Sequence, residues 1–208
     1  MHPDNRAQEP RSKGGPLVKY DIIVCGVGGQ GILSVAAVIA DAAMKAGLEV
    51  RQSEVHGMAQ RGGPVQAQLR ISDTAIHGDL IGHGRADLIL AMDPLESLRY
   101  VEYLNKRGMV ISAAEPFRNI EDYPDETAVL DAIRALPRHR LVQTKRLAEE
   151  AGIPGGANMV LVGAASSELP LPLERIQEAL ESRLASKGQS IVEKNLAALQ
   201  AGRSGSLA

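Results

Sequence analysis

Two stretches of the chain carry residue types that could bind or act on a ligand. The first is a glycine-rich turn formed by Gly26, Gly28, Gly29, Gln30 and Gly31. The second is the 54–63 segment, which contains Glu54, His56, Gly57, Arg61, Gly62 and Gly63. A glycine turn ahead of a helix can hold an anion, because the free N–H groups of the helix point toward the turn. Glycines also allow two backbones to pack closely, and the pattern leaves both interpretations open.

The 54–63 segment has no helical or strand period, so we expect a loop. His56 could transfer a proton or donate a hydrogen bond to an oxyanion. Arg61 could bind a phosphate or carboxylate through two parallel hydrogen bonds. An exposed histidine and a surface arginine fit the pattern equally well. Ten residues are too many for a tight turn, and long loops that follow a parallel strand usually carry function.

Residues 26–31 match the G-x-G-x-x-G pattern of dinucleotide-binding domains. Such a domain also needs an acidic residue at the end of its second strand. Glu49 and Glu54 lie near the required distance, but neither stands at a clear strand end. A stand-alone NAD(P)-binding oxidoreductase is therefore one hypothesis. A non-catalytic interaction module, in which the turn and loop only form an interface, is another.

Composition narrows the function classes. Net charge is -2 and aromatic residues make up 2% of the 208 residues, so we expect neither nucleic acid nor a membrane as partner. The single cysteine, Cys25, ends an apolar stretch and is expected to be a buried thiol. His77 and His83 have no cysteine or paired acid nearby, and no metal site is predicted. With no signal peptide or membrane-length apolar run recognised, we expect a cytoplasmic protein.

The periodicity predicts an α/β fold that is Rossmann-like. Strands are expected at residues 20–24, 48–53, 64–71, 86–92, 108–112 and 141–143, with helices between most of them. Asp93 should cap a helix that begins at Pro94, with Glu96 reaching back to the cap, and Thr144 should cap another. The sheet should be mostly parallel with helices on both faces.

The predicted domain division has four parts. Residues 1–18 are polar and are expected to form a disordered tail, and residues 19–151 should form the Rossmann-like domain. A break rich in glycine is followed by three helical patterns, so residues 152–202 should form a C-terminal helical subdomain. Residues 203–208 are expected to be a second tail.

Taken together, the two stretches resemble the gamma-type domain of 2-oxoacid:ferredoxin oxidoreductases. The motifs are Gly-Val-Gly-Gly-Gln-Gly-Ile from residue 26 and Ser-Glu-Val-His-Gly-Met-Ala-Gln-Arg-Gly-Gly from residue 53. Within that family, the second motif is similar to that of the indolepyruvate-type beta subunits. Residues 87–91, 94–100 and 157–165 also fit, so the resemblance covers residues 19–202.

The resemblance implies an accessory subunit that is inactive alone. The family converts a 2-oxoacid, here indolepyruvate or another aryl 2-oxoacid, to its acyl-CoA and passes electrons to ferredoxin. Thiamine diphosphate, Mg and 4Fe-4S clusters would be held by a large alpha subunit, with CoA as co-substrate and no cofactor resident in this chain.

The same resemblance suggests roles for the two stretches, although it assigns no catalytic residue. The glycine turn, with Gly26, Gly28, Gly29, Gln30 and Gly31 as candidate cofactor-binding residues, would form a close-contact surface. Glu54, His56, Gly57, Arg61, Gly62 and Gly63 would face the alpha subunit or the CoA phosphates. Ferredoxin would be reached through the complex.

Overall fold

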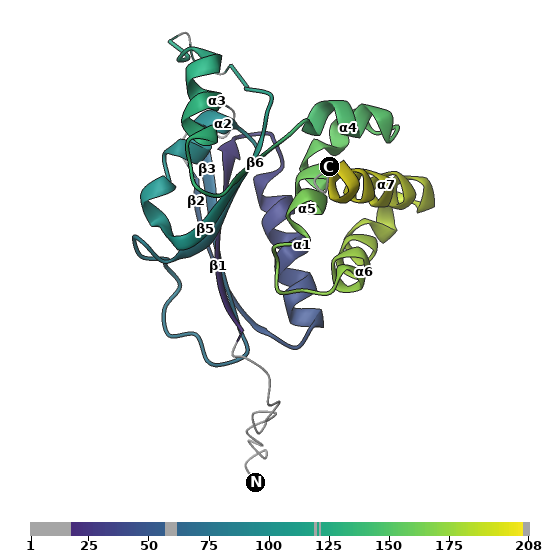
Figure 1. Ribbon diagram of the computed structural model, residues 1–208. Coiled ribbons are helices and arrows are strands. Elements are labelled where there is room, and N and C mark those ends of the chain that lie inside the picture. The colour runs from purple at the N-terminus through teal and green to yellow at the C-terminus, as the bar shows by residue number, and fades with distance from the viewer. Residues whose placement is uncertain (1–17, 57–61, 119, 121, 206–208) are drawn as a thin grey trace.

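The computed structural model describes residues 18–56, 62–118, 120 and 122–205 (Figure 1). The strands are β1 (Lys19–Val27), β2 (Glu49–His56), β3 (Pro64–Ser72), β4 (Ala86–Ala91), β5 (Leu104–Ala113) and β6 (His139–Val142). The helices are α1 (Ile32–Lys45), α2 (Pro94–Leu98), α3 (Glu126–Arg134), α4 (Thr144–Glu150), α5 (Ala157–Ala165), α6 (Leu173–Leu184) and α7 (Gln189–Gly205). The predicted α/β fold is confirmed.

The strands form one sheet in the order β2-β3-β1-β4-β5-β6. Parallel pairing joins β1 to β4, β4 to β5 and β5 to β6, whereas β3 runs antiparallel to both β1 and β2. The sheet is mostly parallel, as predicted. The helix α1 carries the chain from β1 to the outer strand β2, and β3 then returns through the space between them.

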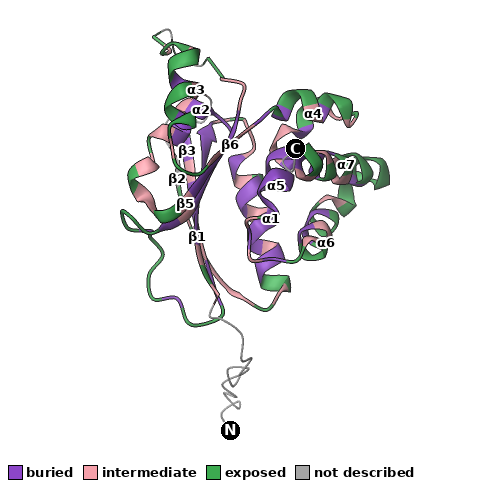
Figure 2. Ribbon diagram, in the orientation of Figure 1, coloured by how far each residue is buried: buried purple, intermediate pink, exposed green. Residues whose placement is uncertain are grey.

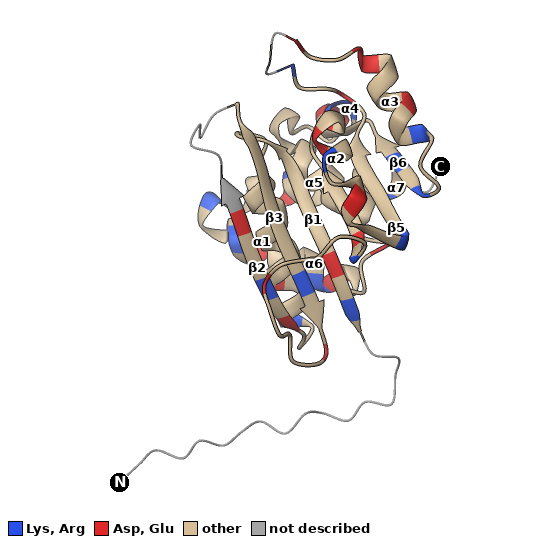
Figure 3. Ribbon diagram, turned by 90° about the vertical axis from the view of Figure 1, so that its left-hand side faces the viewer, with Lys and Arg blue, Asp and Glu red and all other residues tan. Residues whose placement is uncertain are grey.

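Helices cover both faces of the sheet, as predicted. On one face, Ile22 and Val24 of β1 pack in a single buried cluster with Val35 and Ile39 of α1. On the other face, Ile133 of α3 belongs to the cluster that covers the central strands. Figure 3 shows that α2 and α3 lie over the β4–β6 half of this second face, and that no helix lies in front of β2 and β3.

The C-terminal helices pack on the first face. Met159 of α5 and Ile176 of α6 belong to the same buried cluster as α1 and the sheet, and Figure 2 shows buried residues where these helices meet. The helix α7 extends to Gly205, so the predicted C-terminal tail of residues 203–208 begins too early. The division of the chain into a domain and a helical subdomain at residue 152 stays a prediction.

Two glycines allow α5 and α7 to cross at backbone contact. A methyl group added at Gly163 would lie 1.9 Å from the carbonyl oxygen of Leu199. A methyl group at Gly202 would lie 1.9 Å from the carbonyl oxygen of Val160. The backbones of α5 and α7 are therefore in direct contact at these two glycines.

Candidate functional site

The candidate site lies at the carboxyl ends of β1 and β4, which are neighbours in the sheet. From β1 the chain passes through α1 toward β2, and from β4 it passes through α2 toward β5 on the opposite face. In α/β proteins, ligands bind where two adjacent connections diverge in this way. The glycine turn follows β1 and Asp93 follows β4, so both stand at this switch point.

The glycine turn is shaped by positive φ angles. Gly29 has φ +101° and Gly31 has φ +82°, which is the left-handed region that side chains rarely adopt. Gly31 is also the N-cap of α1 and supplies no capping side chain. A methyl group on Gly31 would lie 2.6 Å from Nδ2 of Asn158, so the start of α5 closes over the turn. Sequence reasoning gave Asn158 no role, because the two residues are far apart in the chain.

Gln30 ties the ends of the two central strands together. Its Oε1 accepts a hydrogen bond from the N–H of Val27 at 2.7 Å, and its Nε2 donates to the carbonyl oxygen of Met92 at 3.2 Å. The carboxamide therefore spans the switch point and satisfies one backbone donor of the turn. The predicted assignment of Gln30 to cofactor binding stays a prediction, since these bonds keep both ends of its side chain within the protein.

The two sequence motifs meet at this edge of the sheet. The N–H of Gly28 donates to the carbonyl oxygen of Gly63 at 2.8 Å. Val27 is paired with Pro64 at the start of β3, so the end of the 54–63 segment lies directly beside the glycine turn. The structure thus brings Gly63 to the turn, and Gly62 directly precedes it in the chain.

The other residues of the segment have different positions. Glu54 and His56 lie in β2, so the expectation that the loop begins at residue 54 is wrong. Backbone pairing with β3 extends the strand, with Glu54 opposite Ala67 and His56 opposite Val65. The side chain of Glu54 is exposed. Gly57 and Arg61 lie outside the described residues.

The sheet order does not reproduce a dinucleotide site. That site needs an acidic residue at the end of the strand beside β1. Here β3 occupies that place, and Glu54 stands one strand further out. Two strand spacings amount to about 10 Å, so Glu54 stands about 5 Å further from the glycine turn than the acidic residue of a dinucleotide site.

On the β4 side of the site, the carboxylate of Asp93 contacts three parts of the chain. Its side chain is 1% exposed, and Oδ1 accepts from the N–H groups of Leu95 at 2.9 Å and Glu96 at 3.2 Å, which confirms the predicted helix cap. Oδ2 accepts from the N–H of Phe117 at 2.7 Å, and the hydroxyl of Tyr123 lies 3.4 Å from Oδ1. No local pattern indicated these last two contacts, because they join residues more than twenty positions apart.

Glu96 and Cys25 are buried behind the switch point. The predicted bond from Glu96 back to the cap is absent, since its Oε1 accepts from Nε of Arg99 at 3.0 Å instead. Burial raises the pKa of the Glu96 carboxyl. Burial also raises the pKa of the Cys25 thiol, and the negative charges of Glu96 and Asp93 add to the effect. Cys25 is fully buried as predicted, and at neutral pH it is a protonated thiol rather than a nucleophile.

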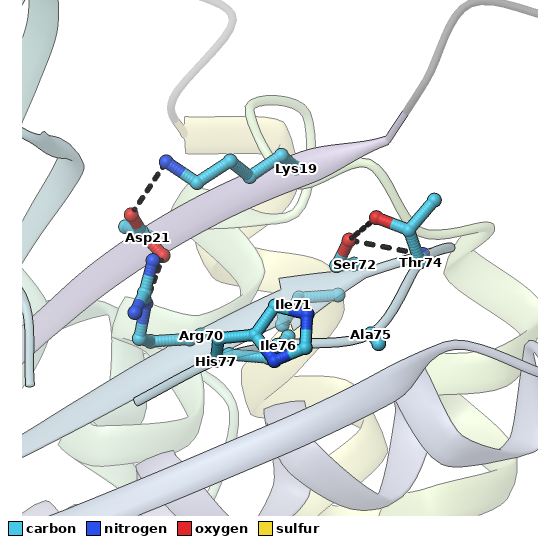
Figure 4. Close-up of a pocket in the computed structure, with 9 residues that line it drawn as sticks. All are labelled: Lys19, Asp21, Arg70, Ile71, Ser72, Thr74, Ala75, Ile76 and His77. Carbon is cyan, nitrogen blue, oxygen red and sulfur yellow. Dashed lines mark hydrogen bonds and ion pairs between the residues drawn. The ribbon is translucent and has the colours of Figure 1, made fainter. Parts of the chain in front are cut away.

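A hollow with a volume of about 100 Å³ lies at the other end of β1. The residues that line it include Lys19, Asp21, Arg70 and His77 (Figure 4). Asp21 is 1% exposed and is held by Nε of Arg70 at 3.0 Å and Nζ of Lys19 at 3.2 Å. Arg70 also donates a hydrogen bond to the carbonyl oxygen of Gly78. The same arginine therefore joins Asp21 of β1 to the 73–85 segment. The hollow is structural, because its charges satisfy one another.

Across the described residues, no group of three or more His, Cys, Asp or Glu side chains is placed to hold a metal ion. The helices in the described ranges are all too short or too polar to cross a membrane. The polar groups at the switch point are backbone N–H groups, the carboxamides of Gln30 and Asn158, and buried carboxyl groups. Such a set can shape and contact a ligand or a partner.

Comparison with known proteins agrees with this fold. The chain belongs to the pyruvate ferredoxin/flavodoxin oxidoreductase family, whose model matches residues 21–205. It is 38% identical to indolepyruvate oxidoreductase subunit IorB of Archaeoglobus fulgidus, over 89% of this chain and 94% of the relative. The IorB subunit of Methanothermobacter thermautotrophicus is 37% identical over 89% of this chain and 96% of its own.

Among solved structures, a keto/oxoacid ferredoxin oxidoreductase gamma subunit from Geobacter sulfurreducens superposes with a TM-score of 0.67. Its identity is 25%, and the match covers 90% of this chain and 98% of that subunit. The resemblance to gamma-type domains, and within them to the indolepyruvate-type small subunits, is therefore confirmed. The chain is a subunit of a multi-subunit oxidoreductase.

Proposed function

We propose that this chain is the accessory subunit of a thiamine diphosphate-dependent indolepyruvate:ferredoxin oxidoreductase. The enzyme would oxidatively decarboxylate indolepyruvate, or a related aryl 2-oxoacid, to its acyl-CoA and pass the electrons to ferredoxin. The observation that carries the proposal is the bond between Gly28 and Gly63, which holds both family motifs together at the switch point. The IorB relatives support indolepyruvate as the substrate.

The proposal assigns thiamine diphosphate, Mg and the 4Fe-4S clusters to a large alpha subunit. An iron–sulfur cluster needs several cysteine ligands, and this chain has one cysteine, which is buried. Thiamine diphosphate stabilises the carbanion formed on decarboxylation. This chain would contribute the surface that meets those cofactors, and it would have no turnover alone.

In this proposal the 54–63 segment faces the alpha subunit or CoA. Arg61 would bind a CoA phosphate, and His56 would donate a hydrogen bond beside it. The turn from Gly26 to Gly31 supports the segment, because Gly28 holds its end at Gly63. Gln30 in turn fixes the glycine turn against β4. The small subunit would thus complete the CoA approach without supplying a catalytic group.

The test is indolepyruvate- and CoA-dependent dye reduction by the co-expressed pair and by each subunit alone. We expect activity from the pair only, and turnover by the small chain alone would refute the proposal. Arg61→Ala should raise the KM for CoA about 10- to 100-fold, since a charge-assisted hydrogen bond contributes about 1.5–3 kcal/mol. Arg51→Ala is the matched control, because Arg51 is exposed on β2 and pairs only loosely with Glu49 at 3.4 Å. If the two variants behave alike, Arg61 does not bind CoA.

A further inference from the structure

We propose that the described residues between β5 and α3 form a docking element for the large subunit, with Phe117 and Ile120 as its apolar anchors. The inference rests on the proposed function, because it takes the large subunit as the partner. It adds a second contact region to the glycine turn and the 54–63 segment. Neither sequence motif includes these residues.

The two anchors form a pair of exposed apolar side chains on one segment. Large exposed hydrophobic residues among those described are Met44, Leu80, Phe117, Ile120 and Ile191. Phe117 is 41% exposed and Ile120 is 46% exposed, and they are three positions apart. The other three lie on separate elements. Scattered apolar residues are normal on a surface, but here two of them lie three positions apart in the chain, and one is its sole phenylalanine, which makes them candidates for a contact site.

The segment is fixed to the switch point at both ends. Asp93 accepts from the N–H of Phe117 and lies within 3.4 Å of the hydroxyl of Tyr123. Glu115, just before Phe117, accepts from the N–H groups of Thr144 and Lys145 at the start of α4. A segment held in place before binding loses less conformational entropy when a partner binds it.

Ile120 also lines a hollow that could receive a partner side chain. It has a volume of about 350 Å³ and is lined by Arg118, Ile120, Tyr123 and residues 124–127. Nε of Arg118 lies 2.6 Å from Oε1 of Glu126 at its rim. Apolar anchors within a charged and polar rim are the usual anatomy of a protein interface. The energetically important side chains of such interfaces tend to fill pockets.

The location of the docking element next to the glycine turn favours the large subunit as its partner. The strands β1, β4 and β5 are parallel, so the segment after β5 emerges at the same end of the sheet as the glycine turn after β1. Figure 3 shows the chain between β5 and α3 at the top of the view. Asp93 is next to Met92, whose carbonyl accepts from Gln30, so one bonded chain of residues joins both regions. The partner that the proposed function places at the glycine turn therefore needs only to extend along this edge to reach Phe117.

The experiment measures binding of the full-length small subunit to immobilised large subunit. We expect the double variant Phe117→Ser, Ile120→Ser to bind at least 10-fold more weakly than the wild type. Met44→Ser is the matched control, since Met44 is 56% exposed at the far end of α1 and should leave the affinity unchanged. Circular dichroism checks the fold of each variant, and Ile120→Arg replaces the double variant if that one unfolds.

Wild-type affinity in the folded double variant would overturn the inference. It would also be overturned if the substitutions broke a homodimer of the small subunit and left its binding to the large subunit intact. Dye reduction separates the two proposals. If the wild-type pair binds but shows no indolepyruvate-dependent reduction, the proposed function fails and the docking result still stands. If the pair is active and the variants bind normally, only the docking inference fails.

Discussion

Replacing Gly163 or Gly202 with alanine should destabilise the protein where α5 and α7 cross. In each case the new methyl carbon would lie 1.9 Å from a carbonyl oxygen of the opposite helix. Both obstacles are backbone atoms, so rotation of a side chain cannot relieve the contact. The helices would have to separate by about 1 Å, and the packing of both on the sheet would loosen.

The size of the effect follows from two opposing terms. Overpacking costs about 1–3 kcal/mol, and a rigid backbone obstacle favours the upper end. Alanine gains about 1 kcal/mol over glycine in a helix. A net loss of about 2 kcal/mol corresponds to a melting temperature about 4–8 °C lower in a protein of this size. Thermal unfolding followed by circular dichroism would measure it.

Gly205→Ala is the control on the same helix. Its methyl group would meet only the flexible side chain of Leu147, at 3.1 Å, so its melting temperature should stay near that of the wild type. The double variant Gly163→Ala, Gly202→Ala should lose less than the sum of the two single losses, because one separation of the helices relieves both contacts. Single variants that melt no lower than Gly205→Ala would refute the close crossing.

Two further predictions concern buried or capping carboxyl groups. The raised pKa of Glu96 means that the folded protein holds the proton more tightly, so this group's contribution to stability is full below about pH 4.5 and is lost as pH rises through the folded pKa. Glu96→Gln should therefore melt above the wild type at pH 8, with a difference that shrinks by pH 4; a constant difference would contradict the assignment. Glu115→Ala should cost about 1 kcal/mol, since the carboxylate caps α4. Denaturant unfolding would show this, with the exposed Glu149→Ala as control, and equal midpoints would exclude the cap.

Local patterns predicted most of the fold. The alternation in β3 and the Asp-Pro start of α2 are determined by neighbouring residues, and both predictions are confirmed. The sequence predicted where this helix begins but not where it ends: α2 stops at Leu98, and Leu104 already begins β5. An apolar residue every three or four positions fits a short helix followed by a buried turn as well as one long helix.

Long-range contacts account for what the sequence did not predict. Thr144 was expected to cap α4 itself, but the cap is the carboxylate of Glu115, which approaches because β5 and β6 are parallel neighbours. The place of β3 between β1 and β2 is a matter of strand pairing, which no local period encodes. For the same reason, the sequence showed the glycine turn and the 54–63 segment as two motifs, and only the fold shows them bonded through Gly28 and Gly63.

The antiparallel strand β3 has a consequence for the length of the connection between β2 and β3. β2 and β3 are paired without interruption from Glu49 opposite Ser72 to His56 opposite Val65. The buried face of β3 holds this register, because a slip of one residue would turn its apolar side chains away from the core. Changing the length of that connection costs little loop entropy. The connection can therefore change in length while β2 and β3 keep the same alignment in the sheet.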